Sequence, residues 1–143
     1  MEAFTEADLL NYIRSHKLAV VATNGPEGEP QSALVGIGST DALELVFDTL
    51  STTRKHTNLE RDNRIAVTFS GPKEKTLQLQ GVAFSVSTAE NEDRRYREAY
   101  YEAWPEGREH LQWAGLAYWA ISPRWARYSD YDLGPLIAEF HWP

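Results

Sequence analysis

The stretch 48-DTLSTTRKHTNLERD-62 places hydroxyl groups directly before two cations, and such groups bind anions together. The residues concerned are Ser51, Thr52, Thr53, Arg54 and Lys55. If 43–49 is a strand and 54–61 a helix, they lie at a joint where the first helical N–H groups have no partner within the helix. The helix dipole, the hydroxyls and the cations would then favour one phosphate group. An ordinary helix cap beside two solvated cations explains the same residues on spacing alone.

The composition limits what else the chain binds. Its 143 residues include 21 acidic and 14 basic side chains, for a net charge of -7. Such a chain repels a phosphate backbone unless it has a strongly basic face, so we expect no nucleic-acid partner. The absence of cysteine excludes disulfides, thiolate metal sites and a cysteine nucleophile. Residues 1–6 lack a targeting pattern and no apolar run is long enough to span a bilayer, so we expect a cytoplasmic protein without membrane contact.

No catalytic acid, base or metal ligand stands out. The histidines are scattered without a ligand-like pair, and the carboxylates show no spacing that singles out two of them. We therefore predict no metal site and name no catalytic residue. The four histidines are His16, His56, His110 and His141.

The elements that must position the joint are mostly short strands within one domain, which we place at residues 1–143. Helices are predicted from a Thr5 cap to about Ser15, over 54–61, from an Asn91 cap to Trp104, and within 106–114. Apolar runs between turn residues predict strands at 17–23, 31–39, 43–49, 64–70, 76–87, 116–122, 125–131 and 136–140. Neighbouring strands joined by short turns favour a mainly β fold, an antiparallel sheet closed into a small barrel with peripheral helices.

Two details of these strands are also predicted. The strand at 76–87 alternates at its start, with Thr76, Gln78 and Gln80 on one face, and Gly81 marks a bulge. Pro123 is expected to interrupt the pairing between 116–122 and 125–131, because proline has no N–H to donate.

The run 46-VFDTLSTTRKHTNLERDNRIAVTF-69 resembles the flavin-phosphate segment of the pyridoxamine 5'-phosphate oxidase-like superfamily, the split-barrel proteins that bind FMN. In that family an aromatic-bearing strand ends in Thr, and a short loop leads to Ser/Thr-Arg-Lys and an amphipathic helix. An Asn-Pro-Arg-like turn and another apolar strand follow. Thr49, Thr53, Arg54 and Lys55 match the first part of this pattern. Arg64 matches the arginine of the turn, whereas Asp62 and Asn63 stand in place of Asn and Pro.

The order of elements extends the resemblance to roughly residues 5–140, and it implies where FMN would lie. The phosphate would lie against Thr53, Arg54 and Lys55, and the ring along 33-ALVGI-37, where backbone groups would bind its edge. Thr76, Gln78 and Gln80 could reach the ring or ribityl chain of the cofactor, or simply face solvent. The expected cofactor-binding residues are Ala33, Leu34, Val35, Gly36, Asp48, Thr49, Thr53, Arg54, Lys55, Thr76 and Gln78.

The resemblance also implies a homodimer with the flavin at its interface. Large aromatic residues are enriched in interfaces, although core packing explains them equally well. The tryptophans considered for this role are Trp104, Trp113, Trp119 and Trp125.

This sequence departs from the true oxidase in ways that favour the general-stress-protein-like branch of the family. The strand that begins with Arg and ends with Lys in the oxidase has Ala33 and Gly38 here, and the chain ends in 139-EFHWP-143 instead of an Arg- and His-bearing segment. The leading hypothesis is an FMN-binding oxidoreductase that acts on an unknown small molecule, with the flavin carrying the redox chemistry. The alternatives are a deazaflavin-dependent reductase, and a flavin carrier or sensor without turnover or a split barrel with an empty site.

Overall fold

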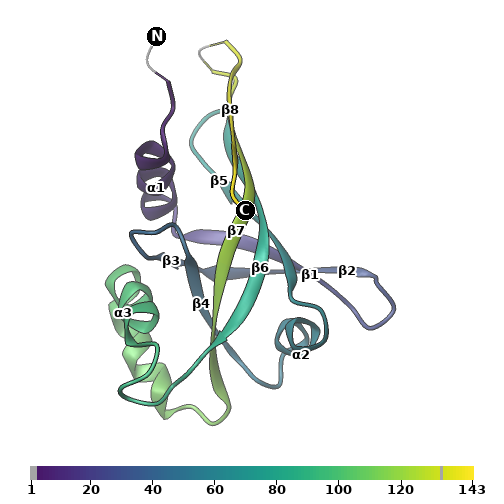
Figure 1. Ribbon diagram of the computed structural model, residues 1–143, viewed down its shortest axis with the longest axis vertical. Helices are drawn as coiled ribbons and strands as arrows, with labels where there is room; N and C mark the ends of the chain where they lie inside the picture. The colour runs from purple at the N-terminus through teal and green to yellow at the C-terminus, as the bar shows by residue number, and fades with distance from the viewer. Residues whose placement is uncertain (1–2, 133) are drawn as a thin grey trace.

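The computed structural model describes residues 3–132 and 134–143, so the predictions for residues 1, 2 and 133 lie outside the described residues (Figure 1). Within these described residues, eight strands and four helical segments follow one another. They are α1 Glu6–Ser15, β1 Leu18–Asn24, β2 Pro30–Gly36, β3 Gly38–Ser39, β4 Leu45–Leu50, α2 Arg54–Arg61, β5 Arg64–Ser70, β6 Lys75–Val86, α3 Arg94–Ala103, the 3₁₀ helix η1 Pro105–Gln112, β7 Leu116–Asp130 and β8 Leu136–His141.

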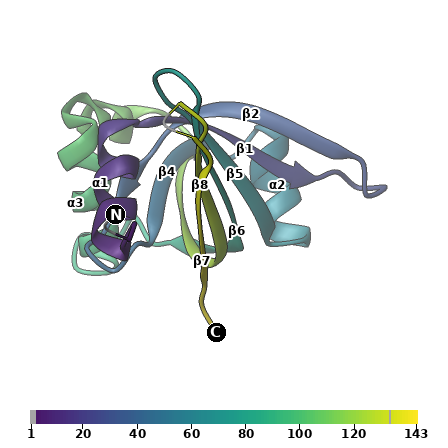
Figure 2. The same cartoon turned by 90° about the horizontal axis from the view of Figure 1, so that it is seen from above.

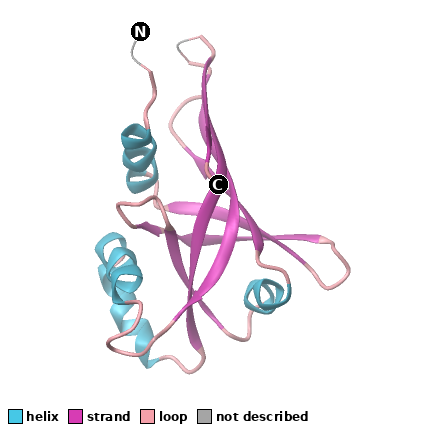
Figure 3. Ribbon diagram, in the orientation of Figure 1, coloured by secondary structure: helices cyan, strands magenta, loops and turns pink. Residues whose placement is uncertain are grey.

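The strands form one antiparallel sheet that curls into a split barrel. Its order is β2-β1-β5-β6-β7-β4-β3, and β8 pairs with the second half of β7, beyond the part that pairs with β4. Figure 2 shows the curl of the sheet from above, and Figure 3 shows the helices outside it. The predicted mainly β, antiparallel split-barrel fold with peripheral helices is confirmed. No helix in the described part of the chain is long and apolar enough to cross a membrane.

The strands bury one face of the sheet, which we call the inner face, because their apolar residues recur at every second position. Val21, Val67 and Leu79 are among the buried residues of this face. The opposite, outer face exposes Val20 of β1, and α3 covers only the part of it near β4. Thr76, Gln78 and Gln80 are exposed on the outer face, as the alternation predicts. The predicted bulge is confirmed by a register shift between Gln80 and Gly81.

The helices that close the inner face begin and end near the predicted positions. Thr5 forms a capping box with Asp8 at the start of α1, and Leu9 and Ile13 of this helix are buried in the core. The helix α2 spans the predicted residues 54–61 and inserts Leu59 into the same core. The core therefore fixes α2 at the end of the β1–β2 hairpin, where the predicted anion joint lies.

Three local predictions need correction. The strand β7 continues through Pro123, because this residue lies opposite Gly81 at the register shift, where the ladder is already irregular. The predicted strand 31–39 is divided at Ile37 into β2 and β3. The cap residue of α3 is Asp93, in a left-handed conformation, in place of Asn91. The Asp93 carboxylate accepts a hydrogen bond from the Ser87 amide and so anchors the start of this helix to the end of β6.

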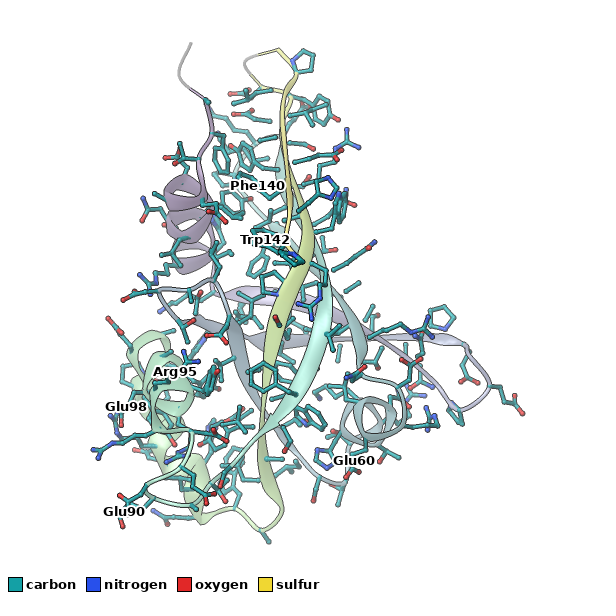
Figure 4. All side chains as sticks on the ribbon, in the orientation of Figure 1. Glu60, Glu90, Arg95, Glu98, Phe140 and Trp142 are labelled. Atoms are coloured by element: carbon teal, nitrogen blue, oxygen red, sulfur yellow. The ribbon has the colours of Figure 1, made fainter. Side chains whose placement is uncertain are left out.

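A cluster of aromatic side chains packs together where β8, the last strand, lies beside α1. Phe4 stacks on Tyr128 with ring centroids 3.9 Å apart, and Phe140 stacks on Trp142 at 6.0 Å (Figure 4). The Trp142 indole donates a hydrogen bond to Glu6. These contacts hold β8 against α1, on the side of the barrel away from α2.

Candidate functional site

A hollow of about 160 Å³ lies between the start of α2 and the inner face of the β1–β2 hairpin. Since a water molecule occupies roughly 30 Å³ of liquid, the hollow has room for a group of several heavy atoms. It is lined by Val21, Thr23, Gln31, Ser32, Ala33, Thr53, Arg54 and Lys55. The structure thus brings the predicted phosphate-binding residues together with Ala33 of the predicted ring strand, although 20 residues of chain separate Ala33 from Thr53.

Arg54 and Lys55 have no hydrogen-bond or ion-pair partner among the residues that the structure describes. Every other lysine and arginine that the structure describes makes a hydrogen bond or an ion pair, except Arg127. In a chain with 21 carboxylates, cations find acidic partners readily. Two adjacent cations without a described partner at one hollow are therefore available to pair with an anion from outside the chain.

Lys55 is the more buried of these two cations. Burial lowers the pKa of its ammonium group below the ordinary lysine value, while the nearby Asp48 carboxylate acts in the opposite direction. Removing water from a cation makes its charged form less stable, and an anion beside it restores that stability. The environment of Lys55 is therefore one that a bound phosphate would improve.

The hydroxyl groups of the joint contribute less than the sequence predicts. Ser51 and Thr52 are exposed and do not line the hollow. The Thr53 hydroxyl donates to the Leu50 carbonyl at 2.8 Å and shares a hydrogen bond with the Thr49 hydroxyl at 2.9 Å. It makes no capping hydrogen bond to the helix, so the first amides of α2 lack the usual side-chain cap. These amides remain suited to an anion.

A buried asparagine fixes α2 to the hairpin. The Asn58 side chain is 2% exposed and donates to the Thr23 hydroxyl at 3.0 Å and to Gln31 Oε1 at 2.9 Å. Its own carbonyl oxygen accepts a hydrogen bond from Arg61 at 3.0 Å, and Arg61 also donates to the Asn24 carbonyl. This network joins α2 to β1 and β2, and so it fixes the distance between the helix and the hairpin on either side of the hollow. Glu60, labelled on α2 in Figure 4, lies outside it and pairs with His56.

The strand β2 presents an unpaired edge beside the hollow. It is the last strand of the sheet on that side, and it pairs only with β1. The hydrogen bond from the Ile37 amide to the Lys17 carbonyl shows which residues of β2 bond to β1. The N–H and C=O groups of successive residues in a strand point to opposite sides. Those of Ser32, Leu34 and Gly36 therefore point away from β1. They are available to a planar ligand along the predicted ring strand.

Thr76, Gln78 and Asp48 do not line this hollow. Thr76 and Gln78 extend from the outer face of β6, whereas the hollow is on the inner face of the same sheet. The Asp48 side chain points to the opposite side of β4 from Thr49, toward α3 and η1. Any contact of these side chains with a ligand would therefore occur outside the hollow.

Asp48 instead belongs to a second polar cluster, which the sequence analysis missed. Its carboxylate accepts a hydrogen bond from His110 Nδ1 at 2.7 Å and another from the Tyr100 hydroxyl at 3.1 Å. The His110 ring stacks on Trp113 with centroids 4.1 Å apart. Since a carboxylate only accepts, Nδ1 carries hydrogen and Nε2 of the neutral ring keeps a lone pair. Asp48 and His110 are 62 residues apart, so no local spacing reveals the pair.

The tryptophans considered for an interface differ in exposure. Trp119 is buried and donates to His56 Nδ1 at 3.0 Å. Trp104 lies against Gly36 and donates to the Ile37 carbonyl, which leaves Trp113 and the half-buried Trp125 as the more accessible pair. In the described ranges there is no cluster of three or more carboxylate or imidazole groups suited to a metal ion.

A model of the family described as pyridoxamine 5'-phosphate oxidase matches residues 5–130. No curated protein matches the chain significantly.

Solved structures share the fold. A haem-binding protein from Mycobacterium smegmatis has a TM-score of 0.81 at 17% identity; the match covers 99% of this chain but only 60% of that protein. A protein from Clostridium acetobutylicum, described as related to general stress protein 26 of B. subtilis, has a TM-score of 0.69 at 21% identity, covering 95% and 92% of the two chains. An FMN-binding protein from Nostoc punctiforme, related to pyridoxamine 5'-phosphate oxidase, has a TM-score of 0.67 at 11% identity, covering 100% and 98%. At these identities the likeness establishes the fold and leaves the ligand open.

Proposed function

This chain belongs to the pyridoxamine 5'-phosphate oxidase family, and from that premise we propose that it binds FMN, with the flavin phosphate in the hollow at Thr53, Arg54 and Lys55. The observation that carries the proposal is the pair of unpaired cations at the uncapped start of α2. The hydroxyl groups of Thr49 and Thr53 support the turn from inside. A family member from Nostoc punctiforme is described as FMN-binding, which supports the same cofactor.

The ring of the flavin would lie along β2. The outward backbone groups of Ser32, Leu34 and Gly36 supply donors and acceptors for its polar edge, and Ala33 and Val35 complete the strand beneath it. Bound FMN supplies hydride transfer, and the protein's part is to hold the ring and exclude water from it. The protein would then be an oxidoreductase acting on a small molecule, within a single domain.

A homodimer would complete this site. Thr76 and Gln78 lie on the outer face of the sheet, whereas the phosphate hollow of the same chain lies on the inner face. If they contact a flavin, it is the flavin of a second copy. The exposed apolar residues of the same face, Leu18, Val20 and Leu34, favour its burial against that copy.

The chemistry of the true oxidase is not part of the proposal. A lysine is expected at residue 38 in that enzyme, and here Gly38 is packed against the backbone of α3, so no long side chain fits. Ala33 likewise provides no charge at the start of the ring strand. We therefore expect no turnover of pyridoxamine 5'-phosphate.

The test is a visible absorption spectrum of the purified protein after addition of FMN and removal of the excess. Wild-type protein is expected to retain two flavin bands, and the Arg54→Ala/Lys55→Ala variant to lose them while it unfolds at the same temperature. The Lys73→Ala/Arg94→Ala variant is the control, because it removes two charges from exposed ion pairs elsewhere. Equal flavin retention in all three proteins would place the phosphate elsewhere.

The same spectrum separates the alternatives within the fold. A deazaflavin would give a different band and strong fluorescence. Bleaching of bound FMN by NAD(P)H and its recovery with an acceptor would support an oxidoreductase. A flavin that no physiological donor reduces would support a carrier or sensor.

Haem is a second candidate ligand, favoured by the cluster at His110. The fold relative from Mycobacterium smegmatis is described as haem-binding. His110 has its Nδ1 held by a carboxylate, the arrangement that fixes and strengthens a histidine metal ligand at Nε2. Leu111 and Trp113 expose apolar surface next to it, at 50% and 53%.

Titration with haemin tests this candidate. A Soret band that is lost in His110→Ala but kept in His141→Ala, an exposed histidine on β8, would support a haem site. Identical haemin spectra for wild type and His110→Ala would remove His110 from consideration.

A further inference from the structure

A row of side chains crosses the outer face of the sheet and includes Arg127 near one end. Residues paired directly across neighbouring strands point to the same face. The registers align Leu34 of β2, Val20 of β1, Thr68 of β5, Gln78 of β6, Arg127 of β7 and Glu139 of β8. The row is apolar at its β2 end and polar at its β7 end. Arg127 therefore places a positive charge on a surface whose other half consists of exposed apolar side chains.

The Arg127 guanidinium group has no hydrogen-bond or ion-pair partner among the described residues. Its Nε is the one buried side-chain nitrogen or oxygen without a hydrogen-bond partner among the residues that the structure describes. A buried donor that lacks a hydrogen-bond partner destabilises the folded chain, and an acceptor brought to it removes that cost. Together with Arg54 and Lys55, Arg127 makes up the set of described lysines and arginines that have no hydrogen bond or ion pair. The other two members of this set line the proposed phosphate hollow.

The nearest carboxylate on the row does not pair with Arg127. Glu139 lies opposite it on β8, but its Oε2 accepts from the Trp125 indole at 3.4 Å and lies 3.7 Å from His141 Nε2. Gln78, on the other side of Arg127, has an amide that makes no hydrogen bond within the described part of the chain, and it is exposed. Gln78 and Arg127 are thus cross-strand neighbours on the outer face, and neither side chain has a hydrogen-bond partner among the described residues.

We propose that Arg127 and Gln78 form an anion-binding subsite, which takes a carboxylate or phosphate group of a small molecule at the outer face of the sheet. A guanidinium group binds either anion through two parallel hydrogen bonds, and the Gln78 amide adds a third donor. The subsite rests on the proposed function for its purpose. In the proposed homodimer, Gln78 and Thr76 reach the flavin of the second copy, so the anion would be held beside that flavin. The subsite then selects a substrate with a negatively charged group.

The arginine Nε–H signals in a ¹H–¹⁵N spectrum provide a direct test, with inorganic phosphate as the probe. The buried Nε–H of Arg127 is protected from exchange with water, and its signal is assigned by its loss in Arg127→Lys. We expect it to move and saturate with phosphate in protein free of FMN. Gln78→Ala should keep the signal and weaken phosphate binding at Arg127 by about tenfold, the loss of one charge-assisted hydrogen bond.

The same titration separates failure of this proposal from failure of the proposed function. A phosphate response at Arg54 without one at Arg127 overturns the subsite and leaves the flavin-phosphate hollow in place. A response at Arg127 in a protein that retains no flavin supports the subsite and contradicts FMN binding. Both conclusions require that Arg127→Lys and Gln78→Ala unfold at temperatures close to that of the wild-type protein.

The anionic group could belong to the substrate or to the flavin itself, and adding FMN distinguishes these sources. If FMN alone shifts the Arg127 signal and Arg127→Lys binds FMN more weakly, the flavin supplies the acceptor. If FMN leaves the signal unchanged and phosphate still shifts it, the subsite is for the substrate. A signal that responds to neither overturns the proposal.

Discussion

The backbone of Gly38 lies directly against the Ala99 carbonyl of α3. A Cβ added at residue 38 would come 2.6 Å from that oxygen and equally close to Tyr100 Cα. Both obstacles are backbone atoms, so neither can rotate away. The contact lets α3 cover the outer side of β3 and β4, and it leaves no room for the lysine that the resemblance to the oxidase implies at this position.

Substitution of Gly38 should therefore destabilise the fold. We expect Gly38→Ala to lower the free energy of unfolding by about 1–3 kcal/mol, and Gly38→Lys to lower it further, because α3 must move away. Urea denaturation measures both. Ala33→Arg is the matched control, since it restores the other charge of the oxidase on a half-buried edge strand, and it should change the stability by less than about 1 kcal/mol. A Gly38→Ala variant as stable as wild type would show that α3 is not fixed by this contact.

This contact also illustrates what the sequence could and could not predict. The bounds of α2 follow from local signals, a cap residue before an amphipathic run, and the structure keeps them. The predicted strand 31–39 is divided at Ile37, because α3 and Trp104 pack against the glycines on either side of that residue. Those contacts come from more than 60 residues away, and no periodicity within the strand reports them.

In the candidate site, too, only contacts between residues close in the sequence could be predicted. Arg54 and Lys55 were predicted correctly as neighbours because they are adjacent in the sequence and both line the hollow. The side of the sheet on which Thr76 and Gln78 lie relative to that hollow depends on the curl of the whole sheet. The Asp48–His110 pair and the isolation of Arg127 depend on strand register and on helix packing, so they become visible only in three dimensions.

Asn58→Ala should loosen the hollow. The substitution leaves the Thr23 hydroxyl, the Gln31 amide and one Arg61 contact without their partner. We expect a loss of roughly 1–3 kcal/mol in the free energy of unfolding, together with weaker FMN binding as α2 moves from the hairpin. Thr57→Ala, at an exposed position one residue earlier, should change neither quantity. Unaltered FMN affinity in a destabilised Asn58→Ala protein would mean that the network supports only the fold.

Tyr12 should make the stability fall at alkaline pH. Burial raises the pKa of its hydroxyl to about 12, and the nearby Tyr128 and Asp130 act in the same direction. The ordinary value in an unfolded chain is about 10. A raised pKa favours the neutral form in the folded state, so the contribution is fully present below pH 10 and is lost as the pH rises toward 12.

Comparison with Tyr12→Phe isolates this effect from the other buried tyrosines. The hydroxyl donates to the Ser70 carbonyl at 3.0 Å, so wild type should be the more stable protein near neutral pH. The difference in urea midpoint should narrow as the pH rises from 10 to 12. A constant difference over that range would show that Tyr12 ionises with an ordinary pKa.

Leu34→Glu should prevent the proposed dimer from forming. Leu34 is 65% exposed on the outer face, so the substitution removes no core contact, but it places a charge in the apolar half of the row that includes Arg127. We expect sedimentation to show a dimer for wild type and a monomer for Leu34→Glu, at similar unfolding temperatures. Leu111→Glu, at an exposed leucine on η1, is the control and should stay dimeric. Because Thr76 and Gln78 would reach the flavin only from a second copy, the monomeric variant should also bind FMN more weakly. A Leu34→Glu dimer with full FMN affinity would require the second copy to pack on another face.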